Sequence, residues 1–256
     1  MNNMNTLATV ISTNFENVQE RIIRSSLACG RDASQIKLVV VSKMHPVEVI
    51  RTAIQAGARF FGENYPEESL SKIINLADVS GIEWHMIGHL QSRKARLVAE
   101  HFDMIQSLDS VHLAEKLDRV LDETQKTLPV LLEFNVSGEE SKYGWPAWQQ
   151  DRWDDLLPDV SRILHLTHLN VVGLMTMPPL LENPEDVRPF FIKLRSFKEF
   201  LARQFKNTDW KELSMGTSSD FEIAIEEGAT IVRVGQAILG PRPENNHPKF
   251  RTDEGV

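Results

Sequence analysis

The sequence has a single cysteine, Cys29, among its 256 residues, and it has no long uninterrupted apolar run. One cysteine cannot form an internal disulfide, which is typical of a protein that works in a reducing compartment. Since Cys29 immediately precedes Gly30 at a predicted helix end, we interpret it as small buried filler. No apolar run approaches the roughly 18 residues that a membrane-spanning helix needs, so we expect no membrane segment.

Basic charge is also scarce, with 28 lysines and arginines against 36 acidic residues and a net charge of -8. An acidic chain is not attracted to nucleic acids or to anionic membranes, so we expect neither as a partner. A local basic pocket for one phosphate is still compatible with this balance. The N-terminal residues lack the basic and apolar regions of a signal peptide. We therefore expect a cytoplasmic protein.

Apolar segments with the period of a strand alternate along the chain with segments that have the period of a helix. This alternation predicts one domain, a (β/α)8 TIM barrel at residues 37–242, with an added N-terminal helix at 1–30 and a tail at 243–256. An open doubly wound sheet is the alternative fold. The expected strands are Leu38–Ser42, Arg59–Gly62, Glu83–Ile87, Met104–Ser107, Val130–Asn135, Leu169–Leu174, Glu212–Ser214 and Ile231–Val234. The expected helices between them are Val47–Ala56, Glu67–Leu76, Ser92–Glu100, Val111–Gln125, Ala147–Leu157, Asp186–Gln204 and Asp220–Glu227.

Lys43 is the first candidate for chemistry because it follows a run of apolar residues that reads as a buried strand. The carboxyl ends of parallel strands form the active-site face of such folds. A partly desolvated amine at this position has a lowered pKa and can form a Schiff base with an aldehyde or ketone. A solvated strand-end lysine is the alternative interpretation.

A phosphate site is indicated by residues 214–220 (Ser-Met-Gly-Thr-Ser-Ser-Asp), which lie between the seventh expected strand and a helix. Small residues at a helix start expose backbone N–H groups, although serine and aspartate also cap helices. On the last strand, Arg233 alternates with valines and so faces the barrel interior, where a buried guanidinium requires a partner. Gly235 lets a ligand approach the backbone there. The pairs His85/His89 and His165/His168 lack a well-placed third ligand, and we interpret them as ordinary polar side chains.

Several of these motifs occur in the order found in the pyridoxal-phosphate homeostasis protein family, also called YggS or PROSC, and the chain resembles that family from about residue 38 to residue 242. The motifs are residues 41–43 (Val-Ser-Lys), 61–65 (Phe-Gly-Glu-Asn-Tyr), 84–91 (Trp-His-Met-Ile-Gly-His-Leu-Gln), 173–178 (Gly-Leu-Met-Thr-Met-Pro), 213–216 (Leu-Ser-Met-Gly) with Ser218 and Asp220, and 232–235 (Val-Arg-Val-Gly).

The resemblance implies a fold like the barrel domain of alanine racemase, with pyridoxal 5'-phosphate (PLP) bound at the carboxyl ends of the strands. It implies that Lys43 holds PLP as an internal aldimine, that Arg233 faces the pyridine nitrogen and that Asn64 lies near the cofactor. It further implies that Ser218, Gly235 and Gln236 surround the phosphate. Lys142 matches a second lysine that is implicated in cofactor transfer.

Three positions depart from the family pattern. The family has Met, Asn and Thr where this chain has Thr217, Arg93 and Gln236, respectively. The change at Gln236 puts a side-chain contact with the phosphate in doubt, although the backbone N–H is retained.

The resemblance implies a monomeric PLP carrier and regulator of vitamin B6 and amino-acid pools, without robust catalysis, with apo-PLP enzymes as candidate recipients. A PLP-dependent amino-acid racemase or decarboxylase is the alternative. Against a racemase, the chain ends soon after the last strand, and residues 44–46 (Met-His-Pro) follow Lys43 where a racemase has a nearby tyrosine. A Schiff-base aldolase would need the lysine and a phosphate site but no arginine at a ring nitrogen.

Overall fold

The computed structural model describes residues 2–242, and the expected tail at 243–256 lies outside the described residues. The strands are β1 (Lys37–Val41), β2 (Phe60–Glu63), β3 (Glu83–Met86), β4 (Met104–Leu108), β5 (Leu128–Asn135), β6 (Trp145–Pro146), β7 (Leu169–Met175), β8 (Glu212–Ser214) and β9 (Ile231–Val234). The α-helices are α1 (Asn2–Ala28), α2 (Val47–Gln55), α3 (Pro66–Asn75), α4 (Ala95–His101), α5 (Val111–Thr124), α6 (Leu157–Leu164), α7 (Arg188–Gln204), α8 (Phe221–Glu226) and α9 (Gln236–Leu239).

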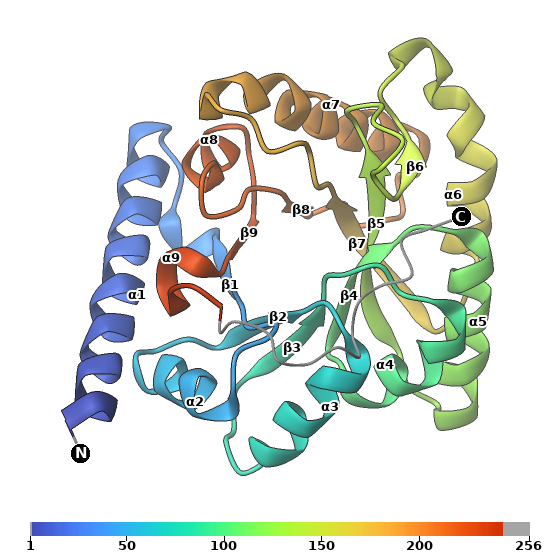
Figure 1. The fold of residues 1–256 in the computed structure, drawn as a ribbon. Helices are drawn as coiled ribbons and strands as arrows, with labels where there is room; N and C mark the ends of the chain where they lie inside the picture. Colours follow the sequence, from blue (N-terminus) through green and yellow to red (C-terminus); the bar gives the residue numbers. More distant parts are fainter. Residues whose placement is uncertain (1, 243–256) are drawn as a thin grey trace.

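The strands close into a barrel. Parallel pairing joins them in the order β4, β3, β2, β1, β9, β8, β7, β5, and a further parallel pairing between β4 and β5 completes the ring. The short β6 adds only a two-residue pairing to β5. Figure 1 shows the strands as a ring with the helices outside it. The prediction of a (β/α)8 barrel is confirmed, and the alternative of an open doubly wound sheet is wrong.

Two apolar layers follow from the alternation of side chains along each strand. The inner layer fills the barrel, and the outer layer packs the other face of the strands against the helices. Val39 and Ile231 belong to the inner layer, and Arg233 pairs in register with Val39 and lies two residues after Ile231, so its side chain is on the same interior side. The inner layer consists of Val39, Met104, Leu131, Val172, Met175 and Ile231.

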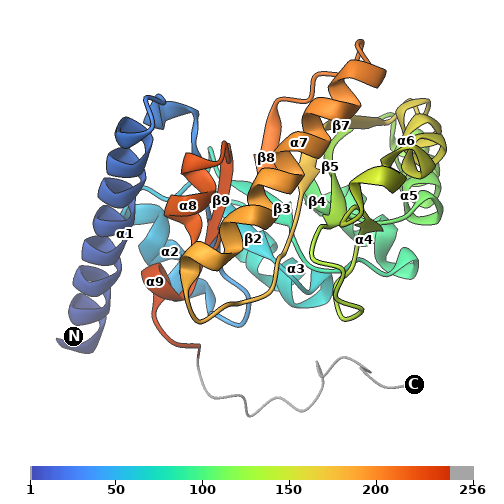
Figure 2. The same cartoon turned by 90° about the horizontal axis from the view of Figure 1, so that it is seen from above.

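The N-terminal helix α1 packs on the outside of the barrel beside α2, α8 and α9 (Figures 1 and 2). Its apolar residues Ile11, Phe15, Val18 and Ile22 recur every three or four positions and are all buried. Because α9 has only four residues, α1 covers this sector of the ring. Cys29, just beyond the last turn of α1, is exposed, so our interpretation of it as buried filler is wrong.

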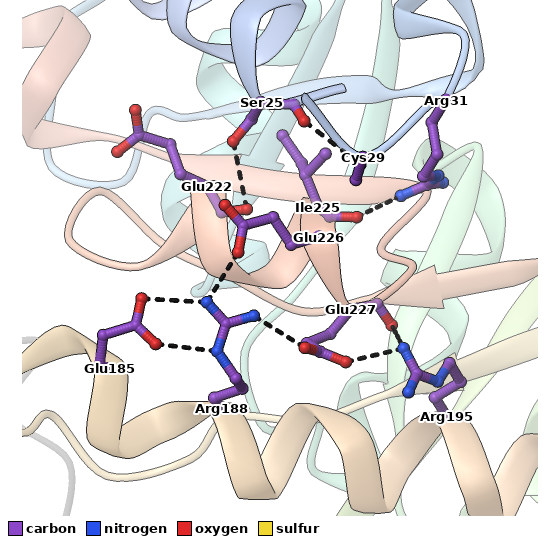
Figure 3. A network of polar contacts seen from close by, with 10 residues as sticks. All are labelled: Ser25, Cys29, Arg31, Glu185, Arg188, Arg195, Glu222, Ile225, Glu226 and Glu227. Atoms are coloured by element: carbon purple, nitrogen blue, oxygen red, sulfur yellow. Dashed lines mark hydrogen bonds and ion pairs between the residues drawn. The ribbon is translucent and has the colours of Figure 1, made fainter. Parts of the chain in front are cut away.

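A network of ion pairs joins α8 to α7 (Figure 3). Arg188 at the start of α7 contacts Glu185, Glu226 and Glu227, each within 2.8 Å. Arg195 pairs with the second oxygen of Glu227 at 2.7 Å. On its other side, α8 is tied to the region after α1 by a hydrogen bond from Arg31 to the carbonyl of Ile225. Both flanks of α8, the helix that follows the predicted phosphate loop, are therefore fixed.

The eight strands that we predicted are all present within one or two residues, but the helix expected over Ala147–Leu157 is wrong. That segment contains a 3-10 helix at Gln150–Leu156, and α6 begins only at Leu157. Pro158 explains the shift because it has no N–H to donate and is accommodated in the first turn of a helix. Among residues 2–242, no helix combines the length and the apolar character needed to cross a membrane.

Candidate functional site

Lys43 lies in the turn that follows β1, at the carboxyl ends of the strands, and it is half-buried. Its amine makes no hydrogen bond or ion pair with any residue in the described part of the chain. Burial is the main reason that its pKa is lowered, the positive charge of Arg242 adds to this effect, and Glu63 and Glu68 oppose it. An amine with a lowered pKa is more often unprotonated near neutral pH and is then a nucleophile.

A buried ionic network beneath the turn holds Lys43 in place. Lys72 of α3, which is 4% exposed, donates to Glu63 at 2.8 Å, to Glu68 at 2.6 Å and to the carbonyl of Ser42 at 2.9 Å. Glu68 in turn accepts a hydrogen bond of 2.7 Å from the backbone N–H of Met44. Met44 has a φ of +65°, a region that non-glycine residues rarely adopt. The network therefore fixes both neighbours of Lys43 in the chain, one of them in an unfavourable backbone conformation.

Asn64 follows β2 at the same end of the barrel. Its Oδ1 atom is buried and has no hydrogen-bond partner among the described residues. Gly88, after β3, allows the chain to approach it closely, because a Cβ at that position would lie 2.7 Å from the Cα of Asn64. A buried amide oxygen without a donor is costly in a folded protein, and such an atom is a candidate contact for a ligand.

Arg233 is 3% exposed and lies inside the barrel near the end of β9. Its guanidinium donates to the hydroxyl of Ser214, to the carbonyl of Thr176 at 2.8 Å and to the sulfur of Met177 at 2.9 Å. Burial lowers its pKa to about 10, which still leaves it charged at neutral pH. No carboxylate of the described residues lies within ion-pair distance, so this cation is held by neutral groups.

The loop after β8 presents free backbone donors. Gly216 has a φ of +93°, and a Cβ there would lie 2.6 Å from that of Ala224. Asp220 accepts hydrogen bonds from the N–H and the hydroxyl of Thr217, which closes the loop. The backbone N–H groups of Ser218 and Ser219 donate to no described residue, and the same is true of Gly235 and Gln236 after β9. Free backbone N–H groups at the ends of neighbouring strands are the kind of donor that binds phosphate.

Sequence reasoning noted His89 only as a polar side chain and missed the group of ionisable side chains to which it belongs, at the ends of β3, β4 and β5. Glu133, 6% exposed on the interior side of β5, has its pKa raised to about 7 by burial and by the charge of Asp109. Asp109 lies 2.7 Å from His89, and this hydrogen bond raises the pKa of His89. The ring of Tyr143 stacks on His89 with centroids 3.9 Å apart. The detectable signal was Glu133 itself, a charged residue within an apolar strand.

Three of the positions singled out from the sequence, Lys142, Gln236 and Arg93, are not buried inside the barrel. Lys142 is half-buried in the loop after β5, and its positive charge lowers the pKa of Glu133 in opposition to burial. The side chain of Gln236 is exposed, and so is Arg93, which donates to Gln91 at 3.0 Å. The structure thus brings Lys43, Asn64, Arg233 and the loop around Ser218 to one end of the barrel, with Lys142 over the β5 side.

Comparison with known proteins gives close relatives over most of the chain. The family model described as the N-terminal domain of alanine racemase matches residues 21–243. A pyridoxal phosphate homeostasis protein of Aquifex aeolicus is 42% identical over 225 residues, covering 88% of this chain and 95% of the relative. The protein of that name in Escherichia coli is 38% identical over 234 residues, with coverage of 91% and 97%.

Solved structures agree with the sequence relatives. The structure of PipY of Synechococcus elongatus with PLP bound superposes with a TM-score of 0.77 at 34% identity, covering 90% of this chain and all of the PipY chain. An alanine racemase of Clostridium difficile superposes with a TM-score of 0.65 at 12% identity, covering 93% of this chain and 57% of the racemase. The latter likeness concerns the fold alone. By sequence and by structure, the chain belongs to the pyridoxal phosphate homeostasis protein family.

Proposed function

We propose that this chain binds PLP at the carboxyl-terminal end of the barrel and acts as a PLP carrier in vitamin B6 and amino-acid homeostasis. The observation that carries the proposal is the amine of Lys43, which has a lowered pKa and no partner among the described residues. Relatives about 40% identical carry the name pyridoxal phosphate homeostasis protein, and the related PipY has been solved with PLP.

The residues present fit this cofactor. PLP supplies an aldehyde, with which an unprotonated lysine amine condenses with loss of one water. Lys43 supplies the amine, and the free N–H groups of Ser218, Gly235 and Gln236 suit the phosphate. Arg233 suits the ring nitrogen, and the unpaired Oδ1 of Asn64 suits a polar group of the ligand.

We further propose that the chain has no robust turnover of its own. An arginine at the ring nitrogen keeps that nitrogen unprotonated, so the ring withdraws fewer electrons from a bound substrate. Racemization also needs two acid/base groups, one on each face of the substrate. His45 follows Lys43 closely where a racemase has a tyrosine, and Tyr143 is exposed and stacked on His89.

The partners of the carrier belong to the same proposal. We propose that it acts as a monomer in the cytoplasm, with apo-PLP enzymes as recipients and Lys142 as a second lysine in the transfer. The unpaired, exposed Cys29 fits a reducing compartment. The half-buried position of Lys142 near the site fits a role for this lysine in the transfer of PLP.

A titration of purified protein with PLP, followed by visible absorbance and dialysis, tests the proposal. We expect retained visible absorbance in the wild type and its loss in Lys43→Ala, with Lys142→Ala as the matched control that keeps it. A wild type that retains no PLP contradicts the carrier role. Alanine racemization that depends on Lys43 and approaches about 1 s⁻¹, the lower end of ordinary turnover numbers, contradicts the absence of catalysis.

A further inference from the structure

A chain of hydrogen bonds runs through the barrel interior from Arg233 to the opposite end of the strands. The guanidinium of Arg233 donates to the hydroxyl oxygen of Ser214, and this hydroxyl lies 2.6 Å from Oε1 of Gln106 on β4. Nε2 of Gln106 lies 2.8 Å from Nδ1 of His85 on β3. Nε2 of His85 lies 3.5 Å from a carboxylate oxygen of Glu83, at the start of β3.

With the amide of Gln106 oriented as it is in the structure, the chain runs in one direction. Arginine has no acceptor, so the Ser214 oxygen must accept from Arg233, and its single proton points to Gln106. The amide oxygen of Gln106 is then occupied, and its N–H group faces His85. Nδ1 of His85 must therefore accept, which places the ring proton on Nε2, toward Glu83. Each bond polarises the next in the same sense, and such chains reinforce themselves in a low-dielectric interior.

The members of the chain are buried except at its far end. His85, Gln106 and Ser214 are each at most 1% exposed, and the side chain of Glu83 is 54% exposed. Arg233 has no ion-pair partner in the described part of the molecule to fix its direction. Its guanidinium is instead held by the Thr176 carbonyl, by Met177 and by Ser214, and only Ser214 belongs to a longer chain.

We propose that Gln106 and His85 are positioning residues, which hold Arg233 toward the cofactor through Ser214. The inference rests on the proposed PLP site. Neither residue needs to touch PLP, because each acts by fixing the hydroxyl proton of Ser214 away from Arg233. Without Gln106, that proton is free to rotate toward the guanidinium, and the oxygen no longer has a fixed lone pair for Arg233.

Matched substitutions cut or keep the chain. His85→Leu and Gln106→Leu remove a link, whereas His85→Asn keeps an acceptor close to the position of Nδ1. The readout is the absorbance spectrum of bound PLP from mildly acid to mildly alkaline pH, which reports protonation of the ring nitrogen. Borohydride trapping of PLP on Lys43 and thermal melting accompany each spectrum.

We expect the two leucine variants to shift the pH profile in the direction of Arg233→Leu and to bind PLP about three- to tenfold more weakly. His85→Asn should stay close to the wild type. Should a leucine variant fail to fold, Gln106→Met replaces it, because methionine fills a similar volume but offers no amide oxygen to Ser214 and no N–H to His85, and the same shift is expected.

Two failures are distinguishable. A wild type that traps no PLP on Lys43 overturns the proposed site itself. Folded variants that trap PLP normally and show the wild-type spectrum and pH profile overturn the positioning role of the chain and leave the site intact.

Discussion

At the scale of single residues, the reactivity of Lys43 depends on side chains that do not touch a ligand. Burial lowers the pKa of its amine, and the pair of Lys72 and Glu63 fixes the turn in which it lies. Met44 keeps its unfavourable φ because Glu68 holds its N–H. The nucleophile is therefore presented by a rigid turn.

Lys72→Met tests this account of the turn. Removing one member of a buried ion pair leaves Glu63 and Glu68 without their cation, and such a loss costs about 3–5 kcal/mol of folding stability. Urea denaturation measures the loss, and Lys72→Arg, which keeps the charge, should recover part of it. PLP uptake should fall in parallel. A stability loss below about 1 kcal/mol, the range of an exposed pair, would contradict the account.

Glu133 gives the apoprotein a pH dependence of known sign. Its pKa is raised from 4.5 to about 7 in the folded protein, so between these values the folded state holds more protons than the unfolded state. Stability from this residue therefore decreases as the pH rises through that window. Glu133→Gln should remove this pH dependence. At pH values above this window, the substitution should stabilise the protein by about 1–3 kcal/mol.

Denaturation in urea at about pH 5 and about pH 8 measures the effect on wild type and variant. Glu140→Gln, a substitution at an exposed carboxylate in the following loop, is the control and should follow the wild type. Equal destabilisation of Glu133→Gln at both pH values would show that Glu133 is already charged and paired in the apoprotein.

The residue scale also shows where sequence reasoning works. The alternation of side chains along the strand was enough to predict that Arg233 faces the interior. The position of Lys43 directly after an apolar strand was enough to predict that it lies at the carboxyl ends of the strands. The pairing of Glu63 with Lys72 was not predictable, because it depends on how α3 docks against β1 and β2. The chain from Arg233 to His85 joins four strands and has no local signature.

At the scale of elements, the loop after β8 and the start of α9 supply the proposed phosphate contacts by different means. Ser218→Ala removes a hydroxyl and should weaken PLP binding by about 0.5–3 kcal/mol, the range for one hydrogen bond to a charged group. Gln236→Ala should change little, because the side chain is exposed and the backbone N–H remains. Equilibrium dialysis with PLP measures both, and a larger loss in Gln236→Ala would contradict this assignment.

The ion pairs between α7 and α8 hold the helix that follows this loop (Figure 3). Glu227→Gln weakens the contacts to both Arg188 and Arg195, and we expect a loss of about 1–3 kcal/mol, because hydrogen bonds to charged groups are the stronger class. The melting temperature of Glu227→Gln should fall by several degrees. Glu185→Gln, a substitution at an exposed position, is the control and should lower the melting temperature less. Equal effects of the two substitutions would contradict a central role for Glu227.

Element boundaries show why local patterns were not sufficient after β5. The apolar and aromatic residues of 145–157 have helical spacing, but Trp145 and Pro146 pair with β5, and Pro158 delays α6. The buried side of this segment is set by contacts with β5 and α7, which the local sequence does not encode. In contrast, the strands other than the three-residue β8 could be predicted because each carries four or more apolar or alternating residues.

At the scale of the whole molecule, the barrel follows from the order of its elements. Eight strands separated by helices favour a closed ring, and the pairing of β4 with β5 closes it. Closure gathers the ends of β1, β2, β8 and β9 at one end, so residues far apart in sequence share a site. That these residues lie at the same end could be predicted once a barrel was assumed. The distances between their side chains could not be predicted.

The most direct test of the central claim is to locate PLP on the chain. Purified protein is incubated with PLP and reduced with borohydride, and the peptides are mapped by mass spectrometry. The account predicts one stoichiometric adduct, on Lys43, that is absent from Lys43→Ala. A principal adduct on Lys142 or on another lysine, or no adduct at saturating PLP, would contradict it.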